Sequence, residues 1–264
     1  MNIEIYWRLG SFSAVLIVMG LAEFYFPRRA PREPRKIRWT RNLSVVVLDN
    51  VLMRLLVPIT AAGVSVYASR HGFGLFNSIE VNSTIAIVLA VIILDLAIYA
   101  QHVLFHWNPL LWRLHKVHHI DHDLDVSTGI RFHPIEILLS TLIKCGVVFL
   151  LGVPFLAVVI FEVTLNAAAM FNHSNVKLPL WIDTNLRKFI VTPDMHRVHH
   201  STEVNETHSN FGFNLAIWDR IFGTYIDQPK HGHEQMTIGL PEYQDSKSGT
   251  FLAILKLPFI KKPK

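Results

Sequence analysis

Two stretches of the chain read His115-Lys116-Val117-His118-His119 and His196-Arg197-Val198-His199-His200. A pair at i and i+4, His102 and His106, stands just before the first stretch. With 15 histidines among 264 residues, chance would produce this histidine spacing only about 0.05 times in such a chain. On a helix, residues i, i+3 and i+4 share one face, and imidazole is the most common metal ligand. The repeated spacing therefore predicts a metal site built on helices.

The number of histidines indicates how many ions the site holds. The three segments offer eight imidazoles, which is more than one tetrahedral ion can use. A structural zinc site takes four ligands, usually including cysteine, and a hydrolytic zinc site takes three and an open position. Eight or more histidines therefore favour two ions. The alternative, surface histidines that cluster by chance, is disfavoured because the spacing is repeated.

The composition predicts an integral membrane protein. Hydrophobic residues make up 51% of the chain and charged residues 17%, with a mean hydropathy of +0.33, which exceeds that of ordinary soluble domains. We predict an all-α protein with four to five transmembrane helices, capped by a cytoplasmic helical region that holds the histidines. The expected spans cover residues 7–26, 43–67 and 81–106 and a hairpin at 135–172, which is broken at Gly152 and Pro154.

A basic stretch at residues 28–41 orients these spans. It carries seven Lys and Arg side chains against one acid, which is typical of the cytoplasmic side and of contact with phospholipid headgroups. The histidine clusters are then all expected on the cytoplasmic face, of a bacterial inner membrane or the endoplasmic reticulum. Within the second span, Asp49 and Arg54 are expected to face protein, as a structural pair.

The expected spans and the positions of the histidines divide the chain into three regions. Residues 1–80 are expected to form membrane anchor helices, residues 81–230 a catalytic domain that includes the hairpin, and residues 231–264 an interfacial tail. The only cysteine, Cys145, lies in an apolar stretch and is expected to be inert packing. The sequence shows no nucleic-acid motif and leaves the oligomeric state open.

At this point the ordered histidine motifs resemble those of the fatty acid hydroxylase and sterol desaturase superfamily. Further matching segments run from about residue 90 to residue 226. They are Arg131-Phe132-His133-Pro134-Ile135-Glu136, Asn172-His173-Ser174, Thr192-Pro193-Asp194-Met195, Asn210-Phe211-Gly212, Trp218-Asp219 and Phe222-Gly223-Thr224.

The resemblance implies a membrane-bound di-iron oxygenase that hydroxylates or desaturates a lipid such as a sterol, a fatty acyl chain or an ether lipid. It implies two Fe2+ ions, with zinc as a substituted metal, and electrons from a separate redox protein or reductase. The ligands that it implies are His102, His106, His115, His118, His119, His173, His196, His199 and His200. Some relatives have a further histidine where this chain has Ala169. That position is open or is filled by water held by Asn166 or Asn172.

Other polar residues are candidates for supporting roles around the ligands. Asp95 lies on about the same helix face as His102 and is expected to orient a ligand imidazole or to bond a neighbouring helix. His208 is expected to line the entrance. His122 is a candidate for such a role or a solvated side chain, and His133 is expected at a helix start positioned by Pro134, in a structural or a supporting role. Asn210 is a further candidate.

Two other classes of function stay open from the residues alone. One is a membrane zinc hydrolase, although the chain has no His-Glu-x-x-His motif. The other is a metal carrier without enzymatic activity. A hydrolase would turn over without oxygen or reductant, and a carrier would move metal into vesicles without consuming oxygen.

Overall fold

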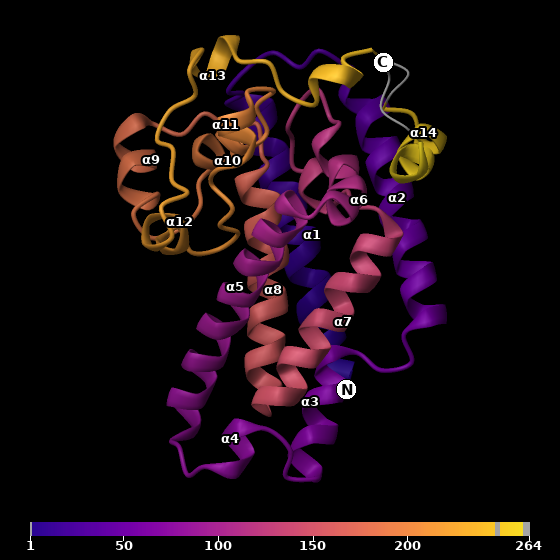
Figure 1. The fold of residues 1–264 in the computed structure, drawn as a ribbon. Helices are drawn as coiled ribbons and strands as arrows, with labels where there is room; N and C mark the ends of the chain where they lie inside the picture. The colour runs from indigo at the N-terminus through magenta and orange to yellow at the C-terminus, as the bar shows by residue number, and fades with distance from the viewer. Residues whose placement is uncertain (1, 246–248, 261–264) are drawn as a thin grey trace.

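The computed structural model describes residues 2–245 and 249–260, and this part of the chain is helical, with isolated bridges but no β-strand. Figure 1 shows a bundle of long helices that carries a cap of short helices and loops at one end. The bundle contains α1 (Asn2–Tyr25), α2 (Arg35–Leu56), α3 (Ala61–Arg70), α4 (Leu75–Ser78), α5 (Ser83–Trp107), α7 (Pro134–Leu151) and α8 (Phe155–Asn172). The cap contains α6 (Pro109–His119), α9 (Leu180–Leu186), α10 (Pro193–His199), α11 (Val204–Thr207), α12 (Ile217–Ile221), α13 (Gly232–Gln235) and α14 (Phe251–Lys256).

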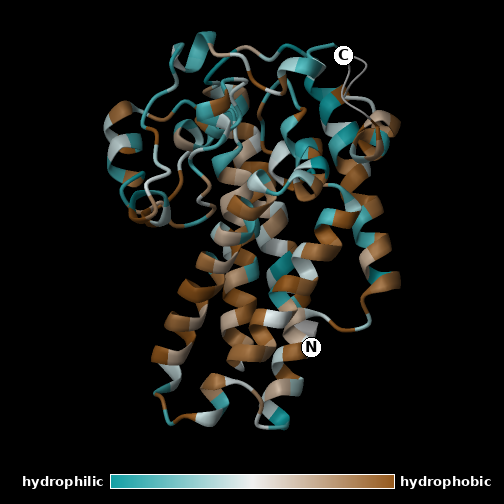
Figure 2. Cartoon of the chain, viewed as in Figure 1, coloured by the Kyte–Doolittle hydropathy of each residue, from teal (hydrophilic) through white to brown (hydrophobic). Residues whose placement is uncertain are grey.

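Five helical stretches in the described chain are long and apolar enough to cross a membrane. They are Glu4–Tyr25, Arg35–Ser78, Ser83–Trp107, Pro134–Leu151 and Phe155–Asn172. Figure 2 shows that hydrophobic residues dominate the bundle and hydrophilic residues gather in the cap. Many large apolar side chains on the bundle are exposed, as expected for helices that contact lipid. The prediction of an all-α membrane protein with about five spans is confirmed.

The hairpin of α7 and α8 forms as its sequence predicts. The imidazole of His133 accepts a hydrogen bond from the backbone N–H of Ile135, and Pro134 occupies the first turn, so α7 begins at a well-capped end. At the other end Gly152 adopts the left-handed conformation (φ 63°), which terminates α7. Pro154 then precedes α8, which returns the chain to the cap.

The second span is not the continuous helix expected over residues 43–67. α2 ends at Leu56 and α3 begins at Ala61, because Pro58 cannot donate a helical hydrogen bond and the Thr60 side chain caps α3. Asp49 is buried, as expected, but Arg54 is exposed, so the expectation that both residues face protein, as a pair, is wrong for Arg54.

The basic stretch lies at the same end of the molecule as the histidines, but several of its charges are paired within the protein and not with lipid. Arg28 forms ion pairs with Asp194 and Glu234, and Arg38 is buried against carboxylates that follow α6. The expectation that phospholipid balances these charges is therefore wrong for Arg28 and Arg38. These pairs fasten the α1–α2 connection to the cap.

Part of the C-terminal region packs on α2 and α6. Ile254 and Leu257 are buried in a cluster with Val45 of α2 and Val117 of α6. This side of the expected interfacial tail therefore contacts protein. The last lysines of that expected tail, Lys261, Lys262 and Lys264, lie outside the described residues.

A close backbone approach between two turns provides a test of the bundle. A Cβ atom on Gly74 (φ 95°) would lie 2.1 Å from the backbone nitrogen of Gly152. A Cβ on Gly72 (φ 68°) would meet nothing within 4 Å. We expect Gly74→Ala to lower the free energy of unfolding by roughly 2 kcal/mol or more, because both backbone strain and a backbone clash act there.

Thermal unfolding in detergent measures this effect, with Gly72→Ala as the matched control. The control introduces left-handed strain without the clash, so its melting temperature should fall less. Equal shifts for both variants would contradict the close packing of the two turns.

Candidate metal centre

Nine buried histidines meet where the bundle joins the cap, and they form two groups. The first contains His102, His106, His115, His119 and His199, and the second contains His118, His173, His196 and His200. In each group one nitrogen from every ring lies within 4.8 Å of the others. Each residue is at most 5% exposed. The structure thus brings together all nine histidines that the sequence singled out.

A sharp corner between α5 and α6 brings the first histidines face to face. The Asn108 side chain accepts hydrogen bonds from the N–H groups of Leu110 and Leu111, at 3.0 and 3.2 Å, and Pro109 starts α6. These hydrogen bonds to the Asn108 side chain let one helix end and the next begin within two residues. The last turns of α5, which hold His102 and His106, therefore lie against the face of α6 that holds His115.

Each histidine pentad contributes to both groups. α6 supplies His115 and His119 to the five-histidine group and His118 to the four-histidine group. The chain at α10 supplies His199 to the first group and His196 and His200 to the second. The i, i+3, i+4 spacing therefore serves two adjacent sites, since neighbouring positions point to different sides of a short helix.

Hydrogen bonds at Nδ1 set the orientation of five rings. The Nδ1–H groups of four of them donate to backbone carbonyl oxygens. These pairs are His102 with Phe211 at 2.8 Å, His118 with Arg131 at 3.0 Å, His173 with Ala169 at 2.7 Å and His199 with Ser209 at 2.6 Å. His115 donates to the Glu136 carboxylate at 2.6 Å. A proton on Nδ1 leaves Nε2 as a lone pair, so these rings are arranged as metal ligands.

The Nε2 atoms approach one another in a way that calls for a cation. His102 and His115 have Nε2 atoms 3.1 Å apart, and the Nε2 of His173 lies 2.9 Å from that of His118. All four of these rings hold their proton on Nδ1, so lone pairs face each other inside a buried site. Two nitrogens about 2.1 Å from one ion and at right angles lie about 3 Å apart. The spacing therefore fits a metal ion in each group.

The unpartnered ring nitrogens and the lowered pKa values of the histidines also indicate metal binding. Both ring nitrogens of His106, His119 and His200 are buried without a hydrogen-bond partner in the described chain, which is unfavourable unless something else binds them. Burial lowers the pKa of His115 and of His173 to about 3. Burial and then neighbouring histidines lower the pKa of His119 and His200 well below the usual value. These imidazoles are neutral at physiological pH, as ligands must be.

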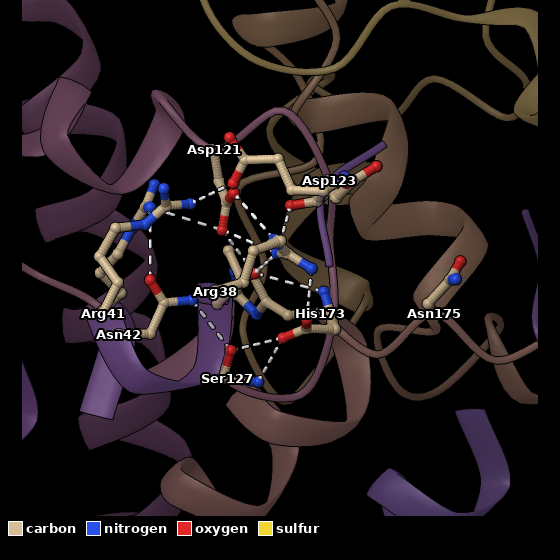
Figure 3. Close-up of polar contacts among 12 residues, drawn as sticks. Arg38, Arg41, Asn42, Asp121, Asp123, Ser127, His173 and Asn175 are labelled. Atoms are coloured by element: carbon tan, nitrogen blue, oxygen red, sulfur yellow. Dashed lines mark hydrogen bonds and ion pairs between the residues drawn. The ribbon is translucent and has the colours of Figure 1, made fainter. Parts of the chain in front are cut away.

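Figure 3 shows an ionic network around Arg38 and Asp121, and Arg131 links this network to His118 of the four-histidine group. Arg38 of α2 donates to Asp121 at 3.2 and 2.8 Å and also pairs with Asp125. Arg131 donates to the backbone oxygen of His118 at 3.1 Å, while its own carbonyl accepts from that ring. Burial opposes ionisation of Asp121, but the charges of Arg131 and Arg38 outweigh it and hold the pKa of that carboxyl well below its usual range.

Of the two roles expected for Asp95, the structure shows the bond to a neighbouring helix, through Trp218 of α12, and no contact with an imidazole in the described chain. Its carboxylate accepts hydrogen bonds from the side chains of Asn214, at 2.7 Å, and Trp218, at 2.8 Å, and from the backbone of Leu215. It therefore fastens the segment 213–218 to α5. That segment carries Phe213, whose ring lies near His102 and His173, so the effect of Asp95 on the centre is indirect.

Two other candidates bind the C-terminal region instead of the centre. His122 contacts the carbonyl oxygen of Tyr243 through Nε2 at 2.5 Å, and His133 caps α7 and contacts that of Leu255 at 3.3 Å. Both are structural contacts between the cap and the chain beyond residue 240. His133 stands at the start of α7, as expected, and neither ring bonds one of the nine histidines in the described chain.

The remaining candidates lie around the centre without bonding its rings in the described chain. His208 is half-buried between Trp107 and His106, with ring centroids 5.2 and 5.5 Å away. Asn210 (φ 50°) donates to the carbonyl oxygens of Met195 and Ile226. Asn172 donates to the Phe213 carbonyl, and the exposed Asn166 donates within α8.

Sequence reasoning missed the role of Glu136, which it noted only as part of a matching segment. The carboxylate is buried in the first turn of α7 and binds His115. Asp219 was missed in the same way, and it accepts from the N–H groups of Phe211 and Gly212 at 2.7 and 2.9 Å. It thereby places the carbonyl that holds His102. An acid at the start of an apolar span was the available signal for Glu136.

A cavity of about 520 Å³ reaches the five-histidine group from the bundle. Residues from α1, α2, α5, α7 and α8 line it, and His102 and His115 stand in its wall. Its size lies in the range of small-molecule sites. A molecule in this cavity would therefore meet the metal centre from the membrane side.

Comparisons with known proteins give one family. A family model described as fatty acid hydroxylase matches residues 87–224. Ornithine lipid hydroxylase OlsE from Rhizobium tropici is 31% identical over 176 residues, which cover 67% of this chain and 51% of that protein. The alkylglycerol monooxygenases of Xenopus tropicalis and Homo sapiens are 28% and 27% identical, over 51% and 50% of this chain and 29% and 28% of their own. The chain thus spans about half or less of these relatives. No solved structure matches it significantly.

The two groups predict two metal ions per chain. Replacing His200 by Ala leaves three imidazoles in its group, so we expect metal content to fall from about two ions to about one. Metal analysis by mass spectrometry on anaerobically purified protein measures this. His231→Ala is the control, because His231 is exposed and lies outside both groups. Unchanged metal content in His200→Ala would contradict a site in the four-histidine group.

Proposed function

The chain belongs to the fatty acid hydroxylase family, and on that premise we propose that it is a membrane-bound, iron-dependent oxygenase that hydroxylates a lipid, or desaturates it. The names of the similar proteins describe a hydroxylase of ornithine lipid and monooxygenases of alkylglycerol. Those names support an oxidation of a lipid. They differ in the lipid, so the substrate of this chain needs its own evidence.

One observation carries the proposal, namely the lone pairs that face one another in two buried histidine groups. The five-histidine group and the four-histidine group would each hold one iron ion. Zinc is expected to bind as a substitute, since imidazole suits both metals. When bound, the two ferrous ions would supply the reduction of dioxygen and the attack on an unactivated C–H bond.

The side chains of this protein would prepare the site for that chemistry. Glu136 and the carbonyl oxygens hold the Nδ1 protons, so each Nε2 stays available without rearrangement. Apolar walls such as Phe105 and Phe132 exclude water beside His115. Helices of the bundle line the cavity, so a lipid chain could lie among them while its reacting carbon approaches His102 and His115.

Hydroxylation also requires electrons and protons. One atom of dioxygen enters the C–H bond and the other leaves as water, which consumes two electrons and two protons. We propose that a separate redox protein or reductase supplies the electrons. The basic stretch lies at the histidine end, which supports a cytoplasmic orientation of the centre, in a bacterial inner membrane or the endoplasmic reticulum.

Labelled oxygen tests this proposal. Protein in lipid nanodiscs, loaded with Fe2+ and supplied with a chemical reductant, is incubated with a native lipid extract under 18O2. We expect a lipid product that is heavier by one 18O atom. His118→Ala should reduce its formation by roughly 100-fold or more, because it removes an imidazole from the four-histidine group.

His231→Ala is again the control and should keep its activity. Mass spectrometry of the extracted lipids detects the product. Turnover that continues without oxygen or reductant would contradict the oxygenase and support a hydrolase. Full oxygenase activity in His118→Ala would contradict the role of the centre.

A further inference from the structure

The cavity beside the five-histidine group has an uneven distribution of charge along its wall. One part of the wall contains Arg8 of α1, Lys144 of α7 and Glu162 of α8, and Glu4 lies beside Arg8 without lining the cavity. Arg8 pairs with Glu4 at 2.7 Å and also with Glu162, and Lys144 pairs with Glu162. Two cations and two carboxylates balance each other. This part of the wall therefore offers no free charge to a ligand.

The part of the cavity wall nearer the histidines carries hydrogen-bond acceptors that receive no hydrogen bond from a donor in the described chain. Asp49 of α2 is 5% exposed, and its Oδ1 is buried without a hydrogen-bond partner in the described chain. Glu136 uses one oxygen for His115, and its other oxygen has no partner in the described chain. Gln101 donates to Ser140 at 2.7 Å, but its own oxygen accepts nothing there. All three residues line the cavity.

Such an arrangement is unfavourable unless a donor occupies the cavity. A buried carboxylate without a partner destabilises a protein by several kcal/mol in general. Glu136 is engaged with a histidine of the centre, but Asp49 stands on a different helix and touches none of the nine. Two carboxylates and an amide oxygen together match a group with a positive charge and three N–H donors, which is an alkylammonium.

The level of these residues in the bundle suits a lipid headgroup. α2 begins higher in the cap than α7 (Figure 1) and packs against it, and Asp49 of α2 lines the same cavity as Glu136 in the first turn of α7. The apolar part of α7 follows directly, so this level corresponds to the boundary between cap and bundle. Headgroups lie at that boundary, and acyl chains would extend toward the apolar side chains beyond it.

We propose that the cavity binds the cationic amino group of a lipid headgroup, with Asp49 as counter-ion and Gln101 and Glu136 as further acceptors. This inference rests on the proposed function, and it narrows the substrate class to amine-bearing lipids. The C–H bonds near the amine would then lie closest to His102 and His115, so hydroxylation would fall on the headgroup side of the molecule.

Binding of two matched probes tests the inference without turnover. The probes are N-palmitoyl-1,4-diaminobutane, which carries one ammonium group, and its N-acetyl derivative, which is neutral. Affinities are measured in nanodiscs by native mass spectrometry, anaerobically and without reductant. We expect the native protein to bind the amine at least tenfold more tightly than the acetylated probe. Asp49→Asn should bind both about equally.

Two further variants keep the test sharp. Asn50→Ala is the matched control, because Asn50 also lines the cavity and bonds only within α2, and it should keep the tenfold preference. Gln101→Leu should reduce the preference by about threefold through the loss of one acceptor, and it provides a second reading if Asp49→Asn fails to fold.

Three outcomes would overturn the inference. The first is equal affinity of the native protein for both probes. The second is a preference that Asp49→Asn retains, which would leave Asp49 as a group that only balances the charge of the metal centre. The third is equally tight binding of a neutral 1-O-alkylglycerol, which would indicate recognition of hydroxyl groups. A preference for the amine probe without any lipid oxidation would contradict the proposed function but support the binding of an amine. Lipid oxidation without a preference for the amine probe would support the proposed function but contradict the binding of an amine.

Discussion

The repulsion between buried imidazole lone pairs is the constraint on which the rest of this structure depends. Carbonyl oxygens and Glu136 hold the protons of His102, His115, His118 and His173 on Nδ1. The Nε2 atoms then face one another at about 3 Å in a buried site. A metal cation bound between them makes that arrangement favourable. The fold and the proposed metal ions therefore support each other.

The scaffold assembles this centre from elements that are far apart in sequence. The Asn108 corner turns α5 onto α6, and the hairpin of α7 and α8 brings His173 back to the cap. Arg38 ties the chain after α6 to α2, so the ring of His118 and the backbone that holds it belong to one ionic network. Helices of the apolar bundle line the cavity, and the polar cap lies at the end of the bundle that holds the histidines.

Local patterns made part of this account predictable from the sequence. The i, i+3, i+4 spacing marked both pentads, and the apolar runs around Gly152 marked the hairpin, because both signals arise from neighbouring residues. The partners of Arg28, Arg38 and Asp95 could not be predicted in this way, since they lie 83 to 166 residues away in sequence. The charge pattern of the basic stretch was therefore assigned to lipid, whereas tertiary ion pairs use much of it.

Diffraction from crystals of anaerobically purified protein, recorded across the iron absorption edge, tests the central claim most directly. The account predicts two anomalous peaks, one beside the Nε2 atoms of His102 and His115 and one beside those of His118 and His173. Two peaks at these places would show that the facing lone pairs bind metal. Absence of any metal peak, with water bonded to the imidazoles instead, would contradict the account.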